Sequence, residues 1–269
     1  LAFYSHRCML GVHTDGDNIV REDMGGPEAM RDGIAGSKRL GLHTTLYVEG
    51  YIVSKESDLA KTGKAERWAV MQKDGSRTGP YLKQGFLHMC PGCVEWQDHL
   101  ADSVTRLLRE TGADGVRLDS LGFYYLPCYN PAHGHQDPFG YNEWIKQLLA
   151  KVRTAALAVN PEVLLLTEGP ADWFGQWFHG ALTARSPRDL TMMRLAVGPF
   201  RPYVYGSGAL WGSLSGFAGG GCGGNEAQGL DWNWLCARFP AHEALVWGDV
   251  ADQDPVSSDP EIVARDRKS

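Results

Sequence analysis

The sequence has 269 residues, a length that suits one large α/β barrel or two small domains. Hydrophobic residues make up 43% of it and charged residues 22%, as in ordinary globular proteins. The net charge of −6 and the lack of any lysine- or arginine-rich run argue against a nucleic-acid partner. No apolar run approaches the ~20 residues of a membrane-spanning helix. Nothing at the start resembles a signal peptide, and the compartment stays open, a secreted or periplasmic location included.

The first part of the chain contains a predicted strand and a predicted helix. The strand covers residues 3–12, and the chain begins inside it, so we expect at least one strand of the fold to be missing upstream. Asp15 follows in the exit loop, where it can face a ligand at the end of the sheet. The helix is expected over residues 27–40, with Pro27 in its first turn and Gly41 at its end.

A second strand is predicted over residues 44–48 and leads into Glu49. This carboxylate at a strand end can contact a ligand or form a salt bridge within the loop, and the sequence leaves both open. Residues 54–88 are polar, and we expect them to be irregular. An insertion of this length after a strand is more often a binding loop or lid than a linker.

Two cysteines after this insertion, Cys90 and Cys93, have the Cys-x-x-Cys spacing of redox and zinc sites. A zinc site needs a second pair of ligands, and Cys222 and Cys236 are too widely spaced to provide one. A redox site needs a thioredoxin-like unit, which the surrounding pattern does not indicate. We therefore expect a structural or incidental role for both cysteines.

An amphipathic helix predicted over residues 96–111 leads into a short apolar strand that carries Arg117 and Asp119. Side chains alternate along a strand, so these two point to the same face, while Val116 and Leu118 point to the other. A cation and a carboxylate at the carboxyl end of a buried strand suggest a functional site, since parallel sheets build their sites at that end. The alternative is a structural ion pair.

The loop at residues 123–137 combines aromatic and polar side chains that can line a substrate cleft. Tyr124 and Tyr125 open it, and His133 and His135 follow. Two histidines one residue apart in a loop are a weak metal signal, so we favour substrate contact or a surface position for both.

A helix predicted over residues 141–159 precedes another apolar strand, residues 162–168, which ends in Glu168. One loop and one helix separate Asp119 from Glu168, so the two carboxylates are expected at the same end of adjacent or near-adjacent parallel strands. This arrangement suits a nucleophile and a general acid/base that act on one bond.

The last third of the chain gives weaker signals. Trp173 lies in a segment with helical spacing, where it can belong to the core or to the edge of a cleft. Strands are predicted over residues 192–197 and 244–247, and the second leads to Asp249. Glycine, serine and alanine dominate residues 206–229, where we expect a long loop.

The segment Asp-Gly-Val-Arg-Leu-Asp-Ser resembles the fourth-strand motif of the α-amylase superfamily and related (β/α)8-barrel glycosidases. In that family an arginine precedes the nucleophilic aspartate by two positions, as Arg117 precedes Asp119. Leu-Leu-Leu-Thr-Glu-Gly is similar to the next strand of the family, which ends in the acid/base glutamate and matches Glu168. The family's Asp…Asn-His region is not matched, and neither is its Asn/Phe-x-x-x-His-Asp segment, which carries the third carboxylate. Asp249, after the strand predicted over residues 244–247, is the candidate for that carboxylate.

The resemblance implies a (β/α)8 barrel over residues 1–252, incomplete at its N-terminus and followed by a polar tail over 253–269. It implies a retaining glycoside hydrolase for α-linked sugars, in which Arg117 orients the nucleophile Asp119 and Glu168 is the acid/base. No cofactor, nucleic acid or membrane is expected. The residues expected to contact the carbohydrate are Glu49, Asp15, Tyr124, Tyr125, His133, His135, Trp173 and Asp249.

Two other functions remain open. A metal-dependent barrel hydrolase would take its ligands from His13, Asp15, His133 or His135. A non-catalytic carbohydrate-binding barrel would keep the carboxylates as hydrogen-bonding groups.

Overall fold

A computed structural model describes residues 2–3, 16–20, 22, 25–119, 121, 125–168, 176–184, 209–213 and 245–247. The chain forms two compact units, Leu1–Gly169 and Pro170–Ser269. Among the described residues no helix is both long and apolar enough to cross a membrane.

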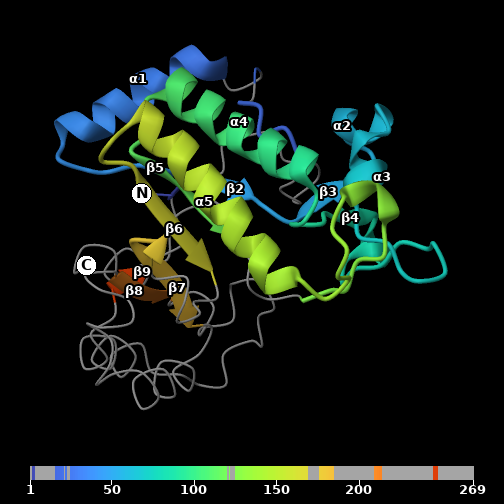
Figure 1. Ribbon diagram of the computed structural model, residues 1–269. Helices are drawn as coiled ribbons and strands as arrows, with labels where there is room; N and C mark the ends of the chain where they lie inside the picture. The colour runs from blue at the N-terminus through green and yellow to red at the C-terminus, as the bar shows by residue number, and fades with distance from the viewer. Residues whose placement is uncertain are drawn as a thin grey trace, which may run out of the picture. The chain divides into compact units, whose positions relative to one another are not determined.

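The first unit is built on a parallel sheet (Figure 1). Its strands are β1 (Ala2–Phe3), β2 (Thr45–Glu49), β5 (Gly115–Asp119) and β6 (Leu164–Glu168), and they pair in that order. β2 and β5 are buried nearly throughout, which is usual for parallel strands whose two faces are covered. The strands predicted around Glu49, Arg117 and Glu168 are thus confirmed. Only Ala2–Phe3 of the first predicted strand lies among the described residues.

β5 and β6 approach each other closely at Gly115. A Cβ atom built on this glycine would lie 1.8 Å from the carbonyl oxygen of Leu164, the residue with which Gly115 pairs. No side chain fits there, so the start of β5 requires glycine for steric reasons.

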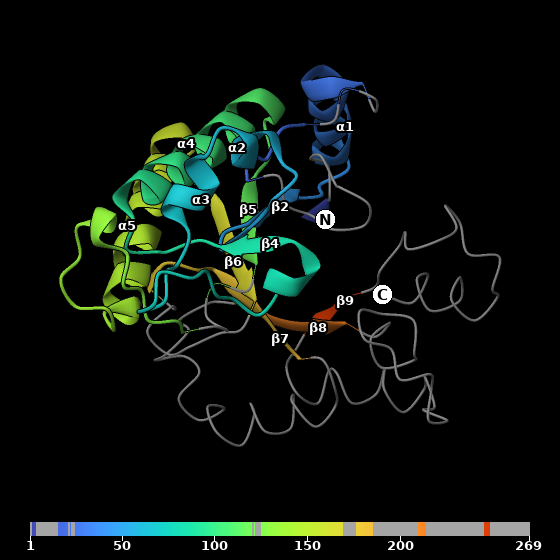
Figure 2. The ribbon, with the colours of Figure 1, turned by 90° about the vertical axis from the view of Figure 1, so that its right-hand side faces the viewer.

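Three helices cover the sheet of this unit: α1 (Gly26–Arg39), α4 (Val94–Thr111) and α5 (Tyr141–Val159). α4 packs against α1 and against α5, and Figures 1 and 2 show all three on one side of the strands. Each has the apolar stripe expected from its sequence: α4, for example, buries Trp96, Leu100, Val104 and Leu107. The predicted helices are confirmed, α5 with the same bounds and α1 and α4 within two residues.

The insertion between β2 and α4 is more ordered than the sequence predicted. It contains an antiparallel pair, β3 (Ile52–Ser54) with β4 (Phe86–His88), and the short helices α2 (Asp58–Lys61), α3 (Lys64–Trp68) and η2 (Leu82–Gln84). The expectation of an irregular segment is wrong, because a few buried apolar residues organise the polar sequence around them. Leu59, Ala65 and Trp68 are among these residues. Figures 1 and 2 place α2 and α3 beside one end of α4.

The loop between β5 and α5 also has local order. Among its described residues is a short helix, η3 (Pro131–His133), which begins after Asn130. The side-chain oxygen of Asn130 accepts a hydrogen bond from the backbone N–H of Ala132. This is the usual capping role of asparagine.

In the second unit the described strands are β7 (Gly180–Ala184), β8 (Ala209–Ser213) and β9 (Leu245–Trp247), which pair in parallel. β9 confirms the strand predicted near residue 245. β8 corrects the expectation of a continuous loop over residues 206–229: within that glycine-rich stretch, Ala-Leu-Trp-Gly-Ser pairs with both neighbours. The predicted strand at residues 192–197 lies outside the described residues.

Candidate active site

Four polar side chains lie on one face of the adjacent strands β2 and β5. The parallel register pairs Tyr47 with Arg117 and Glu49 with Asp119. Within each strand the two residues are two positions apart, so all four project to the same side of the sheet. The pair of charged residues expected on β5 therefore has a matching pair on β2.

Arg117 and Asp119 form a largely buried ion pair. Arg117 Nη1 lies 3.0 Å from Asp119 Oδ1, and the two side chains are 7% and 16% exposed. The guanidinium carbon also lies 5.0 Å from the centre of the Tyr47 ring, within cation–π distance. The Arg117 cation thus contacts both the Tyr47 ring and the Asp119 carboxylate.

The Tyr47 hydroxyl lies between the two carboxyl groups. Its oxygen is 2.8 Å from Asp119 Oδ2 and 2.9 Å from Glu49 Oε2. A phenol has one proton and can donate to only one of these oxygens at a time. Both contacts are hydrogen bonds only when the second proton comes from a carboxyl group.

Of the two carboxyl groups, Glu49 is the one whose surroundings favour the protonated form. Burial raises the pKa of Glu49 well above its usual value, and the negative charge of Asp119 raises it further. Its side chain is buried, while Asp119 lies in direct contact with the Arg117 cation. With a proton on Glu49, the hydrogen bonds would run from the Glu49 carboxyl to the Tyr47 oxygen and from the Tyr47 hydroxyl to the Asp119 carboxylate. The other Glu49 oxygen, Oε1, accepts the backbone N–H of Tyr51 at 3.3 Å.

Glu168 is the last residue of β6, the strand next to β5. The register pairs Leu118 with Thr167, so Asp119 and Glu168 each come one position later in neighbouring parallel strands. The backbone thus brings the ends of these strands together, as the sequence predicted.

The other predicted contact residues have different surroundings. Tyr125 is 48% exposed, with its ring edge against Tyr141. His133 is buried next to Cys128, and His135 contacts Cys90 and stacks on Trp144. Asp15, Tyr124, Trp173 and Asp249 lie outside the described residues.

The structure brings Glu49 together with Arg117 and Asp119, and it brings the two histidines together with two cysteines. The second group, Cys90, Cys128, His133 and His135, could hold a metal ion. A hydrogen bond with Cys90 and another with His133 outweigh the effect of burial and lower the pKa of the Cys128 thiol to about 3.

Tyr47 is a site residue that was not predicted from the sequence. The signal for it was present, because Tyr47 and Glu49 have the same two-residue spacing as Arg117 and Asp119 on the neighbouring strand.

Several known proteins are similar to this chain. A Bacteroides thetaiotaomicron protein named "Putative glycoside hydrolase" is 26% identical over 175 residues, which is 63% of this chain and 25% of that protein. The chain therefore spans about a quarter of the length of this relative. The similarity lies over a limited part of a longer protein.

Solved structures show the same fold at lower identity. The GH36 α-galactosidase AgaA from Geobacillus stearothermophilus is 12% identical, with a TM-score of 0.59 over 97% of this chain and 34% of that one. The α-amylase from Geobacillus thermoleovorans, solved with acarbose, is 14% identical, with a TM-score of 0.53 over 78% of this chain and 49% of its own. At identities of 12% and 14%, these likenesses show a shared fold.

One family model covers most of the chain and includes β2, β5, β6 and the four residues of the candidate site. It matches residues 23–215 and is described as "Domain of unknown function (DUF6259)". The chain belongs to the DUF6259 family.

Proposed function

We propose that this chain is the catalytic part of a retaining glycoside hydrolase that cleaves α-linked sugars. The observation that carries the proposal is Asp119 at the carboxyl end of β5, held by the Arg117 guanidinium on one oxygen and by the Tyr47 hydroxyl on the other. Two neighbouring folds belong to enzymes named for α-linked substrates, an α-galactosidase and an α-amylase. In this proposal residues 1–252 form most of a (β/α)8 barrel.

In the first step an Asp119 carboxylate oxygen attacks the anomeric carbon, and the bond from that carbon to the leaving oxygen breaks. Glu168 gives its proton to the leaving oxygen, so the departing sugar leaves as a neutral alcohol. The sugar is then an ester of Asp119, and Glu168 is a carboxylate. In the second step Glu168 takes a proton from water, and the resulting oxygen attacks the same carbon. The ester bond breaks, the Asp119 carboxylate is restored and the anomeric configuration is retained.

The residues around Asp119 suit a nucleophile. A cation beside a carboxylate and a hydrogen bond to it both favour the ionised form, which is the form that attacks. Two contacts on different oxygens also fix the orientation of the carboxylate plane. Glu49 takes no part in bond making here; as a neutral acid it holds the Tyr47 hydroxyl toward Asp119 without adding a second negative charge.

The test is a Glu168→Ala variant with substrates of different leaving groups. Without the acid, cleavage of glycosides with poor leaving groups should fall by about 10²–10⁴-fold. An aryl glycoside with a good leaving group needs little protonation, so its first step should survive and the glycosyl-enzyme should accumulate. Azide needs no base, and it should restore turnover and release a glycosyl azide that has the configuration of the substrate.

Glu162→Ala is a matched control, since Glu162 is an exposed carboxylate just before the same strand. Glu162→Ala should leave every rate unchanged. Asp119→Ala should be inactive, and azide should not restore turnover by the ester route, because no glycosyl ester can form at residue 119. An azide product of inverted configuration from Glu168→Ala would overturn the assigned roles. A wild-type protein that binds sugars but turns over no activated glycoside would overturn the enzymatic proposal altogether.

A further inference from the structure

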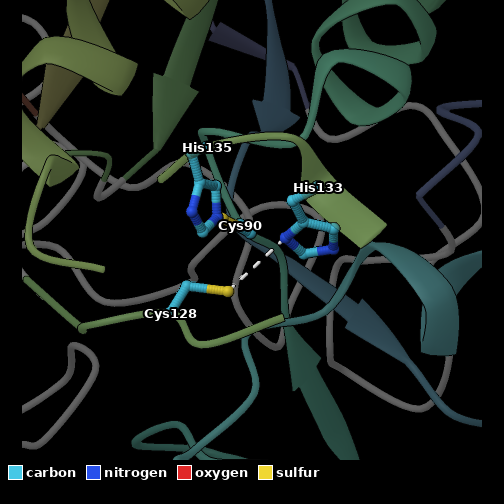
Figure 3. A group of neighbouring side chains, drawn as sticks. All are labelled: Cys90, Cys128, His133 and His135. Carbon is cyan, nitrogen blue, oxygen red and sulfur yellow. Dashed lines mark hydrogen bonds between the residues drawn. The ribbon is translucent and has the colours of Figure 1, made fainter. Parts of the chain in front are cut away.

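A second group of reactive side chains lies away from the strands of the sheet. Cys90 follows β4 in the turn before α4, and Cys128, His133 and His135 belong to the loop between β5 and α5. One ligand atom from each of the four lies within 4.8 Å of the others. Figure 3 shows the two sulfur atoms and the two imidazole rings turned toward a common centre.

We propose that these four residues bind a zinc ion through Cys90 Sγ, Cys128 Sγ, His133 Nδ1 and His135 Nε2. Two thiolates and two imidazoles are a set that zinc prefers, with four ligands in a tetrahedron. Since all four positions are filled by protein atoms, the site is structural and not catalytic. The inference does not depend on the glycosidase proposal.

The distances fit a tetrahedral site. Cys128 Sγ lies 3.4 Å from His133 Nδ1, and Cys90 Sγ lies 3.6 Å from His135 Nε2. Zinc bonds of about 2.3 Å to sulfur and 2.0–2.1 Å to nitrogen give a sulfur–nitrogen edge of about 3.6 Å in a tetrahedron. The other distances between ligand atoms are at most 4.8 Å. This limit exceeds the edge of a zinc tetrahedron by about 1 Å, a difference that small side-chain rotations remove.

The residues around His133 hold its ring in the orientation that a metal ligand needs. His133 Nε2 lies 2.9 Å from the carbonyl oxygen of Arg67. Asn130 Nδ2 donates to the same carbonyl at 3.1 Å and lies 2.9 Å from Nε2. If Nε2 carries the ring proton and donates it to the carbonyl, Nδ1 keeps its lone pair toward Cys128. Metal-binding histidines commonly use their second nitrogen in this way.

His135 is fixed by packing. Its ring stacks on Trp144, with the ring centres 4.1 Å apart and the planes 27° from parallel. At Gly92, the turn that carries Cys90 lies close to the rings of His135 and Trp144. A Cβ atom there would lie 2.6 Å from Trp144 and 2.9 Å from His135, so only a glycine lets Cys90 come this close.

Burial and charge agree with zinc as the ion. Cys90, Cys128 and His133 are 0%, 1% and 6% exposed. Two thiolates balance the two positive charges of the ion, so the complete site is neutral and suits a buried position. The cysteines must give up any thiol protons to bind, and the histidines must bind as neutral rings.

The ion would join two loops that lie at the same end of β5. α4 runs antiparallel to β5, so its first residue and the turn with Cys90 lie near the end of the strand that carries Asp119. The loop with Cys128 and His133 leads from that end of β5 to α5. The site therefore fastens the loop before α4 to the loop after β5.

The test begins with metal analysis of the protein purified without added metal or chelator. We expect about one zinc ion per chain, as for other closed structural sites. Cobalt substituted for zinc should give the intense visible absorption of a tetrahedral ion together with sulfur-to-cobalt charge-transfer bands. Cys128→Ser and His133→Ala should each lose most of the bound zinc. Neither measurement depends on enzymatic activity.

Two control variants sharpen the ligand assignment. His43→Ala removes an exposed histidine, and Cys93→Ser removes a buried sulfur near His133 that is not in the four-residue set. Both should keep zinc. Loss of zinc in Cys93→Ser with retention in His135→Ala would overturn the assigned ligand set. If the ligand variants do not fold, zinc is removed from the wild type with a chelator and titrated back, with the cobalt spectrum as readout.

Nitrogen NMR of the zinc-saturated protein gives a further check, because His133 should carry its proton on Nε2. A protein that contains no metal and takes none up would overturn the proposal. A disulfide between Cys90 and Cys128 under reducing purification, or a proton on His133 Nδ1 in the presence of zinc, would do the same.

Discussion

The proton on Glu49 leads to a stability test. Replacing Glu49 by glutamine keeps the shape of the neutral carboxyl, and its amide N–H can donate to the Tyr47 oxygen as the carboxyl does. The glutamine cannot ionise. We therefore expect Glu49→Gln to match the wild type in stability near pH 4 and to exceed it at neutral pH.

The sign follows from the raised pKa of Glu49. The unfolded chain loses the Glu49 proton near pH 4.3, whereas the folded protein keeps it, so protonation stabilises the fold fully only below about pH 4.3. As the pH rises toward the folded pKa, the wild type loses up to about 1.4 kcal/mol of stability per pH unit at this residue. The glutamine variant has no such loss.

The size of the effect can be estimated from the contacts. Glu49 Oε2 and Asp119 Oδ2 both lie within 2.9 Å of the Tyr47 oxygen. They are therefore closer than about 6 Å, and a second negative charge at that distance would add a repulsion of about 3 kcal/mol at an effective dielectric constant of about 20, which opposes ionisation of Glu49. A fold that keeps this proton up to pH 7 loses about 4 kcal/mol between about pH 4.3 and pH 7. A gain of about 4 kcal/mol in Glu49→Gln at pH 7 corresponds to a rise in Tm of about 8–16 °C.

The assay is urea unfolding of both proteins from pH 4 to pH 8, compared as the difference in unfolding free energy. Glu56→Gln, at an exposed glutamate of the following segment, is the control for replacing a glutamate by glutamine. Tyr47→Phe removes the hydroxyl that lies between the two carboxyl groups and should be less stable by about 1–3 kcal/mol across the range. If Glu49→Gln is instead the less stable protein at pH 7, Glu49 is ionised in the fold and the proton assignment is wrong.

Two other substitutions test the ion pair and the sheet. Arg117→Ala should lower stability by about 3–5 kcal/mol because it removes the cation from a buried carboxylate. Turnover per folded molecule should fall about 10–100-fold through loss of a charged contact, and unchanged turnover per folded molecule would make the pair purely structural. Gly115→Ala should cost more than about 4 kcal/mol, because its Cβ would lie 1.8 Å from the Leu164 carbonyl oxygen. Gly33→Ala is the control: nothing lies within 4 Å of its Cβ position in α1, so it should gain up to about 1 kcal/mol in chemical denaturation.

The helices and the strands of the first unit could be predicted because each has a local periodic signal. α5 repeats its apolar residues at helical spacing, and the backbone confirms its bounds at Tyr141 and Val159. The two-residue alternation of strands likewise gave the common face of Arg117 and Asp119 before any partner strand was known. The same rule applied to Tyr47 and Glu49 would have found the other half of the site.

Contacts between distant segments could not be predicted in this way. The four residues of the proposed zinc site come from two loops separated by a helix and a strand. The one zinc-like spacing in these loops, Cys90 to Cys93, joins a proposed ligand to a residue outside the set. The sequence indicated a pair of Cys90 with Cys93, whereas the structure groups Cys90 with Cys128. β8 gave no signal for a similar reason: two of its five residues are alanine and glycine, and its pairing with neighbouring strands identifies it.

The two polar sites of the first unit depend on different parts of the fold. Tyr47, Glu49, Arg117 and Asp119 lie on paired strands, so sheet hydrogen bonds and buried neighbours fix their positions. The proposed zinc ligands lie on loops, where the backbone has fewer such constraints and an added cross-link contributes most to order. Loss of zinc should therefore loosen the loops at the carboxyl end of β5 while the contacts around Asp119 persist. In the proposed enzyme the sheet would therefore order the residues around Asp119, and the zinc ion would order the two loops that it joins.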